Sequence, residues 1–199
     1  HFYDRGWTGI NIEPHSDFFV RLAASRPRDV NLNCGAGAVN GHAPFFELAI
    51  REWSSFERKA GNQAKQRGEL VSTKMISIMP LNEILERHAC DRAIDFLKID
   101  VEGWEREVLL GLDLRRFRPK VVIVEVINPF SPDANSEAWA DLLRQGGYED
   151  AYFDGLNRFF VAGERADLRM HFATPPNVFD DYVLADIVNL EKEASGLRR

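Results

Sequence analysis

The stretch DFLKIDVEGWEREVLLGL, Asp95–Leu112, decides the fold because it joins a buried-strand pattern, an acidic turn and a helical pattern. In an extended chain successive side chains point to opposite faces, so Lys98, Asp100 and Glu102 share one side. Gly103 then lets the backbone turn, and apolar residues recur at helical spacing beyond it. The stretch therefore predicts a strand, an acidic turn and a helix.

The charged side of this strand requires an explanation, because desolvating an unpaired charge is costly. Asp100 and Glu102 could bind an ammonium group or a metal ion, or act as a general base. The structural alternative is an internal ion pair with Lys98. We favour a functional role, because carboxylates at strand ends in α/β sheets gather where ligands bind.

Strand and helix patterns alternate along the rest of the chain. A short helix is expected over 80–88, with Pro80 near its start, and another from about Ser136 to Gln145, while the polar, glycine-punctuated segment 54–70 predicts a surface loop. Further strands are expected at 8–14, 29–34, 43–48, 73–80, 119–126, 148–154 and 158–163. The alternation predicts an α/β fold with a doubly wound, mostly parallel sheet and an antiparallel C-terminal hairpin.

Composition limits the classes of function. The 199 residues, 45% hydrophobic and 11% aromatic, suit a single domain over 1–199. A net charge of −6 with interleaved signs argues against a nucleic-acid partner, and the absence of a long apolar run argues against membrane insertion. Cys34 and Cys90 form no CxxC motif, which predicts a cytoplasmic protein. Composition leaves the oligomeric state open.

Two features of the first half suggest a nucleotide. Glu13 ends the first predicted strand, where its paired oxygens could accept hydrogen bonds from two ribose hydroxyls. It could equally stabilise the next helix through the helix dipole. The Cys34–Ala36 turn precedes an extended segment rather than a helix, so a phosphate loop is disfavoured. Small residues such as Gly35 would instead allow a flat ring to approach.

Further candidates lie in the second half. Glu125 ends the run VVIVE and repeats the acidic strand end, so we expect it to contact substrate. Asp154 and Asn157 occupy the tip of the predicted hairpin, where either a plain turn or a substrate contact is possible. The histidines and cysteines lack the spacing of a zinc site, and we assign no metal.

Several stretches also resemble a known family. FLKIDVEGWEREVLLGLDLRRFRPKVVIVEV closely resembles the core motif of FkbM-type S-adenosylmethionine-dependent methyltransferases. HFYDRGWTGINIEP, RPRDVNLNCGAG, YFDGLNRFFVA and PPNVFDDY resemble the version of that family associated with glycan and polysaccharide biosynthesis. The resemblance implies a Rossmann-like class I methyltransferase fold, S-adenosylmethionine as cofactor, and O-methylation of a hydroxyl on a sugar, glycan or other small molecule.

Roles follow from the resemblance residue by residue. Glu13 would bind the cofactor ribose, the Cys34–Ala36 turn would lie at the adenine, and Asp100 would lie near the methionine end. The chemistry of methyl transfer to a hydroxyl, rather than the resemblance, makes Asp100 or Glu102 the candidate base, with Lys98 as counter-charge. The family's first strand and its glycine-rich loop would precede HFYDRGW, so we expect an N-terminally truncated domain. The alternatives are a degenerate methyltransferase domain serving as an interaction module, and another nucleotide-binding α/β enzyme.

Overall fold

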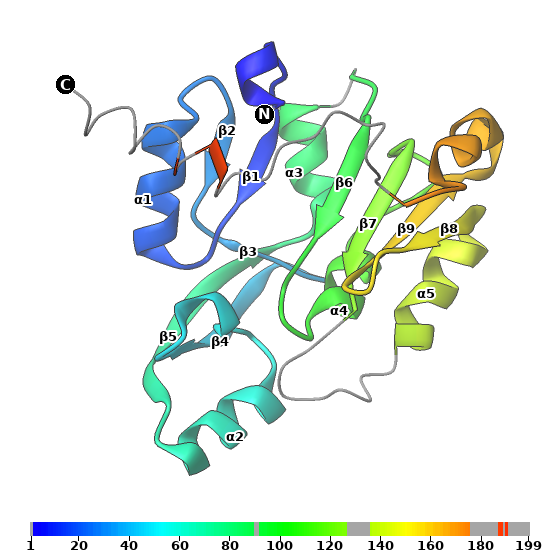
Figure 1. The fold of residues 1–199 in the computed structure, drawn as a ribbon. Coiled ribbons are helices and arrows are strands. Elements are labelled where there is room, and N and C mark those ends of the chain that lie inside the picture. Colours follow the sequence, from blue (N-terminus) through cyan, green and yellow to red (C-terminus); the bar gives the residue numbers. More distant parts are fainter. Residues whose placement is uncertain (1, 90–91, 127–135, 176–186, 189, 191–199) are drawn as a thin grey trace.

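A computed structural model describes residues 2–89, 92–126, 136–175, 187–188 and 190. Helices and strands alternate along it, as predicted, and its described strands form three sheets (Figure 1). The first sheet pairs two parallel strands joined through a helix; these elements are β1 (Ile10–Ile12), α1 (Ser16–Ser25) and β2 (Val30–Leu32).

The second sheet has the order β3-β5-β4. Its strands are β3 (Gly35–Ala36), β4 (Gly41–Leu48) and β5 (Leu70–Met79). The first of these pairs parallel with β5, and β4 pairs antiparallel with it. The helix α2 (Arg58–Arg67) connects β4 to β5.

The loop predicted over 54–70 is wrong, because most of it forms α2. The Glu57 side chain caps the helix by accepting the Lys59 amide at 2.9 Å. Ala60 and Ala64 are buried, and a Cβ added at Gly61 would overlap the Phe46 ring of β4. Only this narrow stripe of small residues packs against the sheet. The other residues of the helix are polar, so its sequence lacks the apolar periodicity that predicts a helix.

The third sheet has the order β6-β7-β9-β8 and contains the predicted C-terminal hairpin. Its strands are β6 (Phe96–Ile99), β7 (Val121–Glu125), β8 (Tyr148–Phe153) and β9 (Asn157–Ala162). The remaining α-helices are α3 (Leu81–His88), α4 (Glu105–Leu110) and α5 (Ser136–Gln145), and 3-10 turns lie at Tyr3–Arg5, Arg51–Trp53 and Gly163–Phe172. The helices predicted over 80–88 and 136–145 are confirmed, the first of them beginning at Leu81 with Pro80 as its N-cap.

The pairing differs in part from the expected single, mostly parallel sheet. Three of the six pairings between described strands are parallel and three are antiparallel. Among the described strands, β1 pairs only with β2, and β6 pairs only with β7. A single apolar cluster nevertheless extends across the third sheet and its helices, and Ile10, Ile12 and Leu32 of the first sheet pack against it.

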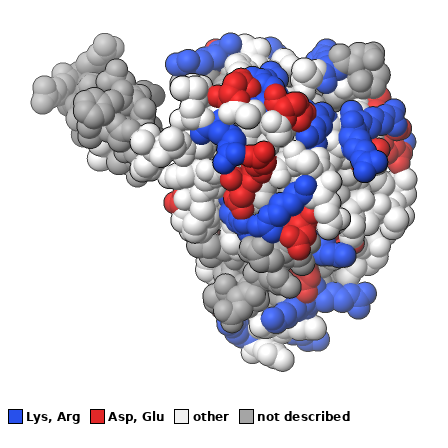
Figure 2. Space-filling view, turned by 90° about the vertical axis from the view of Figure 1, so that its right-hand side faces the viewer, with Lys and Arg blue, Asp and Glu red and all other residues white. Residues whose placement is uncertain are grey.

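The surface shows no segregation of charge on the side that carries β8 and β9. Figure 2 shows Lys and Arg interleaved with Asp and Glu there, and ion pairs join Arg118 to Glu164 and Arg165 to Asp167. None of the helices in the described residues combines the length and apolar character needed to cross a bilayer. Residues 176–182, most of the PPNVFDDY motif, lie outside the described part.

Candidate active site

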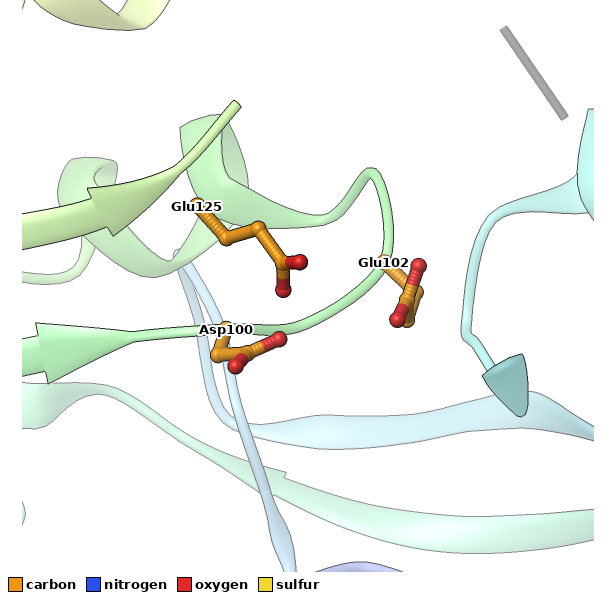
Figure 3. Close-up of side chains that lie close together, drawn as sticks. All are labelled: Asp100, Glu102 and Glu125. Carbon is orange, nitrogen blue, oxygen red and sulfur yellow. The ribbon is translucent and has the colours of Figure 1, made fainter. Parts of the chain in front are cut away.

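Parallel pairing of β6 and β7 brings two carboxylates to the same edge. Their register sets Ile99 opposite Val124, so Asp100 and Glu125 are the next residues on adjacent strands. Glu102 follows in the turn, and one carboxylate oxygen from each of the three residues lies within 4.8 Å of the others. Figure 3 shows the three side chains converging between the end of β7 and the β6–α4 turn. We call these residues the acidic trio.

The turn that carries Glu102 has an unusual backbone. Glu102 has φ 53° and Gly103 has φ 99°, both in the left-handed region that disfavours residues with a Cβ. The Ser55 hydroxyl donates to the Glu102 carbonyl oxygen at 2.7 Å. The Gly103 amide donates to the buried Glu105 carboxylate at 2.9 Å. Hydrogen bonds from two directions therefore hold the turn in this conformation.

Burial and mutual repulsion make two members of the trio more basic. Burial, followed by the negative charges of Asp100 and Glu105, raises the pKa of Glu102 to about 7. Burial, a hydrogen bond with Asp100 and the charge of Asp100 raise the pKa of Glu125 to about 8. Glu102 Oε2 is buried and has no hydrogen-bond partner among the described residues. The trio therefore offers a carboxylate that can accept a proton near neutral pH.

Lys98 connects the trio to the β8–β9 hairpin. Its Nζ lies 3.2 Å from Asp100 Oδ2 and donates to Asn157 Oδ1 at 2.5 Å. The internal ion pair considered as the structural alternative is thus present, and among the described residues it leaves the other two acids of the trio without a cation at this distance. The Asp154 carboxylate accepts the Leu156 and Asn157 amides at 2.8 and 2.6 Å, so Asp154 serves the hairpin turn.

The expected cofactor residues of the first half of the chain lie just after β1, on β3 and in the segment between β2 and β3. Glu13 follows β1, and its Oε1 accepts the His15 amide at 2.7 Å, so the role at the start of α1 is realised. Burial raises the pKa of Glu13, although this hydrogen bond and His15 oppose the increase. Cys34 is a buried free thiol. A Cβ added at Gly35 would overlap the Phe56 ring, so a protein side chain approaches there.

The sequence analysis missed the residues that join the expected cofactor turn to the acidic turn. The Trp104 indole donates to the Ala36 carbonyl oxygen at 3.2 Å and lies 5.9 Å from the Phe56 ring, centroid to centroid. Trp104 also borders a hollow of about 310 Å³. The hollow is lined by His42, Ala43, Pro44, Phe56, Glu57, Arg58 and Trp104. The only sequence signal for these contacts was an aromatic residue beside the acidic motif.

Two kinds of group could bind at the trio. Three carboxylate oxygens within 4.8 Å of one another suit a divalent cation, which prefers oxygen ligands. They equally suit a hydroxyl or an ammonium group, which would donate to the unpartnered Glu102 oxygen.

Comparison with known proteins identifies the family. The model of the methyltransferase FkbM domain matches residues 1–149. Over 87 residues, 40% of this chain, the sequence is 36% identical to the AMB antimetabolite synthetase AmbE of Pseudomonas aeruginosa, and the match spans 4% of AmbE. No solved structure matches the chain significantly. The alternation of strands and helices, the acidic strand ends and the match over 149 residues agree: the chain belongs to the FkbM family of S-adenosylmethionine-dependent methyltransferases.

Proposed function

We propose that the protein methylates a hydroxyl oxygen, and that this hydroxyl belongs to a sugar of a glycan or polysaccharide. The acidic trio is the observation that best supports hydroxyl chemistry, because two of its carboxyls have raised pKa values beside an exposed third acid. A base works best when its pKa lies near the operating pH. Glu102, with a pKa of about 7, meets that condition.

The chain's own groups suit S-adenosylmethionine. We assign the ribose hydroxyls to Glu13, whose Oε2 remains beside an Oε1 that already accepts the His15 amide. We assign the methionine ammonium to Asp100, which is exposed at the end of β6. The cofactor supplies, when bound, a methyl group on a positively charged sulfur. The adenine would lie near Cys34 and Ala36. It would approach from the side away from Phe56, because the Phe56 ring already occupies the space beside Gly35.

The trio would move one proton during the reaction. The acceptor hydroxyl donates to Glu102 Oε2, and its proton passes to that oxygen as the hydroxyl oxygen gains the methyl group. The charge of Asp100 increases the basicity of Glu102, and Lys98 limits the increase. Partial burial of Glu102 excludes part of the competing water and so strengthens these electrostatic effects.

The hollow beside Trp104 is our candidate for the acceptor site. The faces of Trp104 and Phe56 can stack on the apolar face of a sugar ring, while His42, Glu57 and Arg58 offer polar groups to its hydroxyls. Its volume of about 310 Å³ lies at the lower end of the range for small-molecule sites.

Polar groups of β7 and of the β8–β9 hairpin complete the proposal. Glu125 of the trio lies opposite Asn157 on β9, and Asn157 accepts a hydrogen bond from Lys98. We assign Glu125 and Asn157 to the acceptor. The Asn157 side-chain amide donates to Asp154 Oδ2 at 3.1 Å, so Asp154 orients it. We also propose a cytoplasmic site of action, which the free thiol of Cys34 supports.

Binding and product analysis test the proposed function. Calorimetry should show binding of S-adenosylmethionine and none of NAD. Mass spectrometry of the source organism's glycans should show the loss of one methyl group per modified residue when the gene is deleted. Unchanged glycans together with a newly unmethylated small molecule would refute the glycan acceptor and retain the methyl transfer.

Substitutions on α2 test the acceptor hollow. Arg58→Ala should raise the KM for the acceptor, because it removes a guanidinium from the lining. Lys65→Ala removes a charge of the same sign two turns further along the helix and outside the lining, so it should leave KM unchanged. Equal effects of the two variants would place the acceptor elsewhere.

A divalent cation on the trio is a second candidate role, favoured by the spacing of its carboxylate oxygens. A cation would orient acceptor hydroxyls and replace the base. Dialysis against EDTA distinguishes the two roles: activity should persist if Glu102 is the base, whereas loss of activity that Mg²⁺ or Mn²⁺ restores would assign the trio to a metal.

A further inference from the structure

We propose that Ser55 is a positioning residue for the acidic turn. Its hydroxyl holds Glu102 in the left-handed conformation that places the Glu102 carboxylate beside its two acidic neighbours. The consequence for catalysis rests on the proposed function, whereas the effect on the backbone of Glu102 does not.

Ser55 is rigidly fixed by its own surroundings. Only 1% of the residue is exposed. Its backbone forms an antiparallel bridge with Phe46 of β4, with hydrogen bonds of 2.8 and 3.2 Å in the two directions. Its Oγ also accepts the Glu57 amide at 2.9 Å, which leaves the hydroxyl proton for the Glu102 carbonyl oxygen at 2.7 Å. The donor is thus oriented before it meets the acidic turn.

Glu102 requires such a contact because its conformation is intrinsically unfavourable. Of the described residues other than glycine, it has the one positive φ. A Cβ in this region lies too close to the backbone, so the turn would relax toward negative φ if its carbonyl lost its partner. Rotation about φ moves the carbonyl and changes the direction of the side chain relative to the strands, which would carry the carboxylate away from the trio.

The neighbouring serine provides a matched control. Ser54 Oγ accepts the Leu48 amide at 3.1 Å, so its hydroxyl stabilises the local β4 connection. Ser55 instead reaches a residue 47 positions further along the chain. Ser54→Ala therefore removes a hydroxyl with one backbone partner and Ser55→Ala a hydroxyl with two, but only the second substitution touches the acidic turn.

Nuclear magnetic resonance of the full chain tests the backbone effect without an acceptor. The Glu102 Cα shift and its amide–Hα coupling should report a left-handed residue in the wild type and in Ser54→Ala, and a changed φ in Ser55→Ala. If Ser55→Ala does not fold, Ser55→Cys keeps the size of the side chain with a weaker donor and should shift the same signals. A left-handed Glu102 in the folded Ser55 variant would overturn the proposal.

Kinetics in the presence of S-adenosylmethionine tests the consequence for catalysis. Ser55→Ala should lower kcat by about tenfold, less than the roughly 10²- to 10⁴-fold expected for losing a general base outright, and leave the cofactor dissociation constant unchanged. In a Glu102→Gln background the same substitution should have no further effect. An equal loss in both backgrounds would show that Ser55 acts by another route. If Glu102→Gln alone keeps full activity, the proposed base is wrong, and the resonance signature still decides the positioning role.

Discussion

The β6-β7-β9-β8 sheet and the β1–β2 pair have strands of similar apolar composition but very different burial. Val122 and Val124 of β7 and Phe160 of β9 are 0% exposed. By contrast, β1, β2 and α1 contain no buried residue. Apolar side chains therefore identify strands in both regions, but they do not decide which strand becomes the core. That depends on what covers each strand.

The difference follows from the number of neighbours. Both β7 and β9 have a partner on each edge, whereas β1 and β6 each have one among the described strands. Phe96, at the start of β6, is 38% exposed and contacts Phe2 and Trp7, with ring centroids 5.4 and 6.2 Å away. We propose that the described elements form one domain. The shared apolar cluster supports this proposal.

The same substitution, phenylalanine to alanine, should destabilise the two regions by very different amounts, and this is the largest effect that we expect. Phe160→Ala removes a ring that is 0% exposed and lies 6.0 Å from the Trp139 ring, centroid to centroid, so it should cost about 3 to 5 kcal/mol of unfolding free energy. Phe19→Ala on α1 removes a half-buried ring and should cost about 1 kcal/mol. Urea unfolding measures both free energies, and similar costs would show that the two regions do not differ in how much their apolar side chains stabilise the fold.

The two acids that follow β6 should separate chemistry from cofactor binding. Glu102→Gln should lower the single-turnover methylation rate by about 10²-fold or more and leave the cofactor dissociation constant unchanged, because the amide cannot accept the proton. Asp100→Asn should instead raise that dissociation constant. Normal methylation by a Glu102→Gln enzyme that binds cofactor would refute this division of roles.

At the end of β1, Glu13→Ala should weaken cofactor binding by about 1 to 3 kcal/mol, the range for losing hydrogen bonds to a charged group. Asp17→Ala is the control, because it removes an exposed acid from the first turn of α1. Calorimetry with S-adenosylmethionine should separate them. If both variants bind cofactor equally well, Glu13 serves only the start of the helix.

The smallest effect concerns pH. Because the folded pKa values of Glu102 and Glu125 are raised above 4.5, their contribution to stability is present below that pH and is lost as pH rises through about 7 to 8. After allowance for solvent screening we expect a loss of about 1 to 2 kcal/mol between pH 5 and 8.5. Urea unfolding should show a smaller loss of stability with pH for Glu102→Gln than for the wild type. Glu52→Gln, which replaces an exposed acid, is the control and should show the same loss as the wild type.

Local patterns predicted most of the elements. The helices near 81–88 and 136–145, the C-terminal hairpin and the strand at 119–126 follow from periodicity, caps and β-branched runs, which act over a few residues. The pattern failed at α2, where the stabilising contacts of Ala60 and Ala64 come from β4 and β5. A helix that packs through small residues carries little periodic hydrophobicity of its own.

The sequence by itself determined the acidic turn after β6, the acidic end of β7 and the family to which both belong, because strand alternation and a strand's end are local properties. Only the tertiary structure decided that Asp100 and Glu125 are neighbours, since strand order and register are set by packing between distant segments. It also decided that Ser55 contacts the acidic turn and that Trp104 contacts Ala36, because such contacts depend on three-dimensional proximity and leave no periodic signal in the chain.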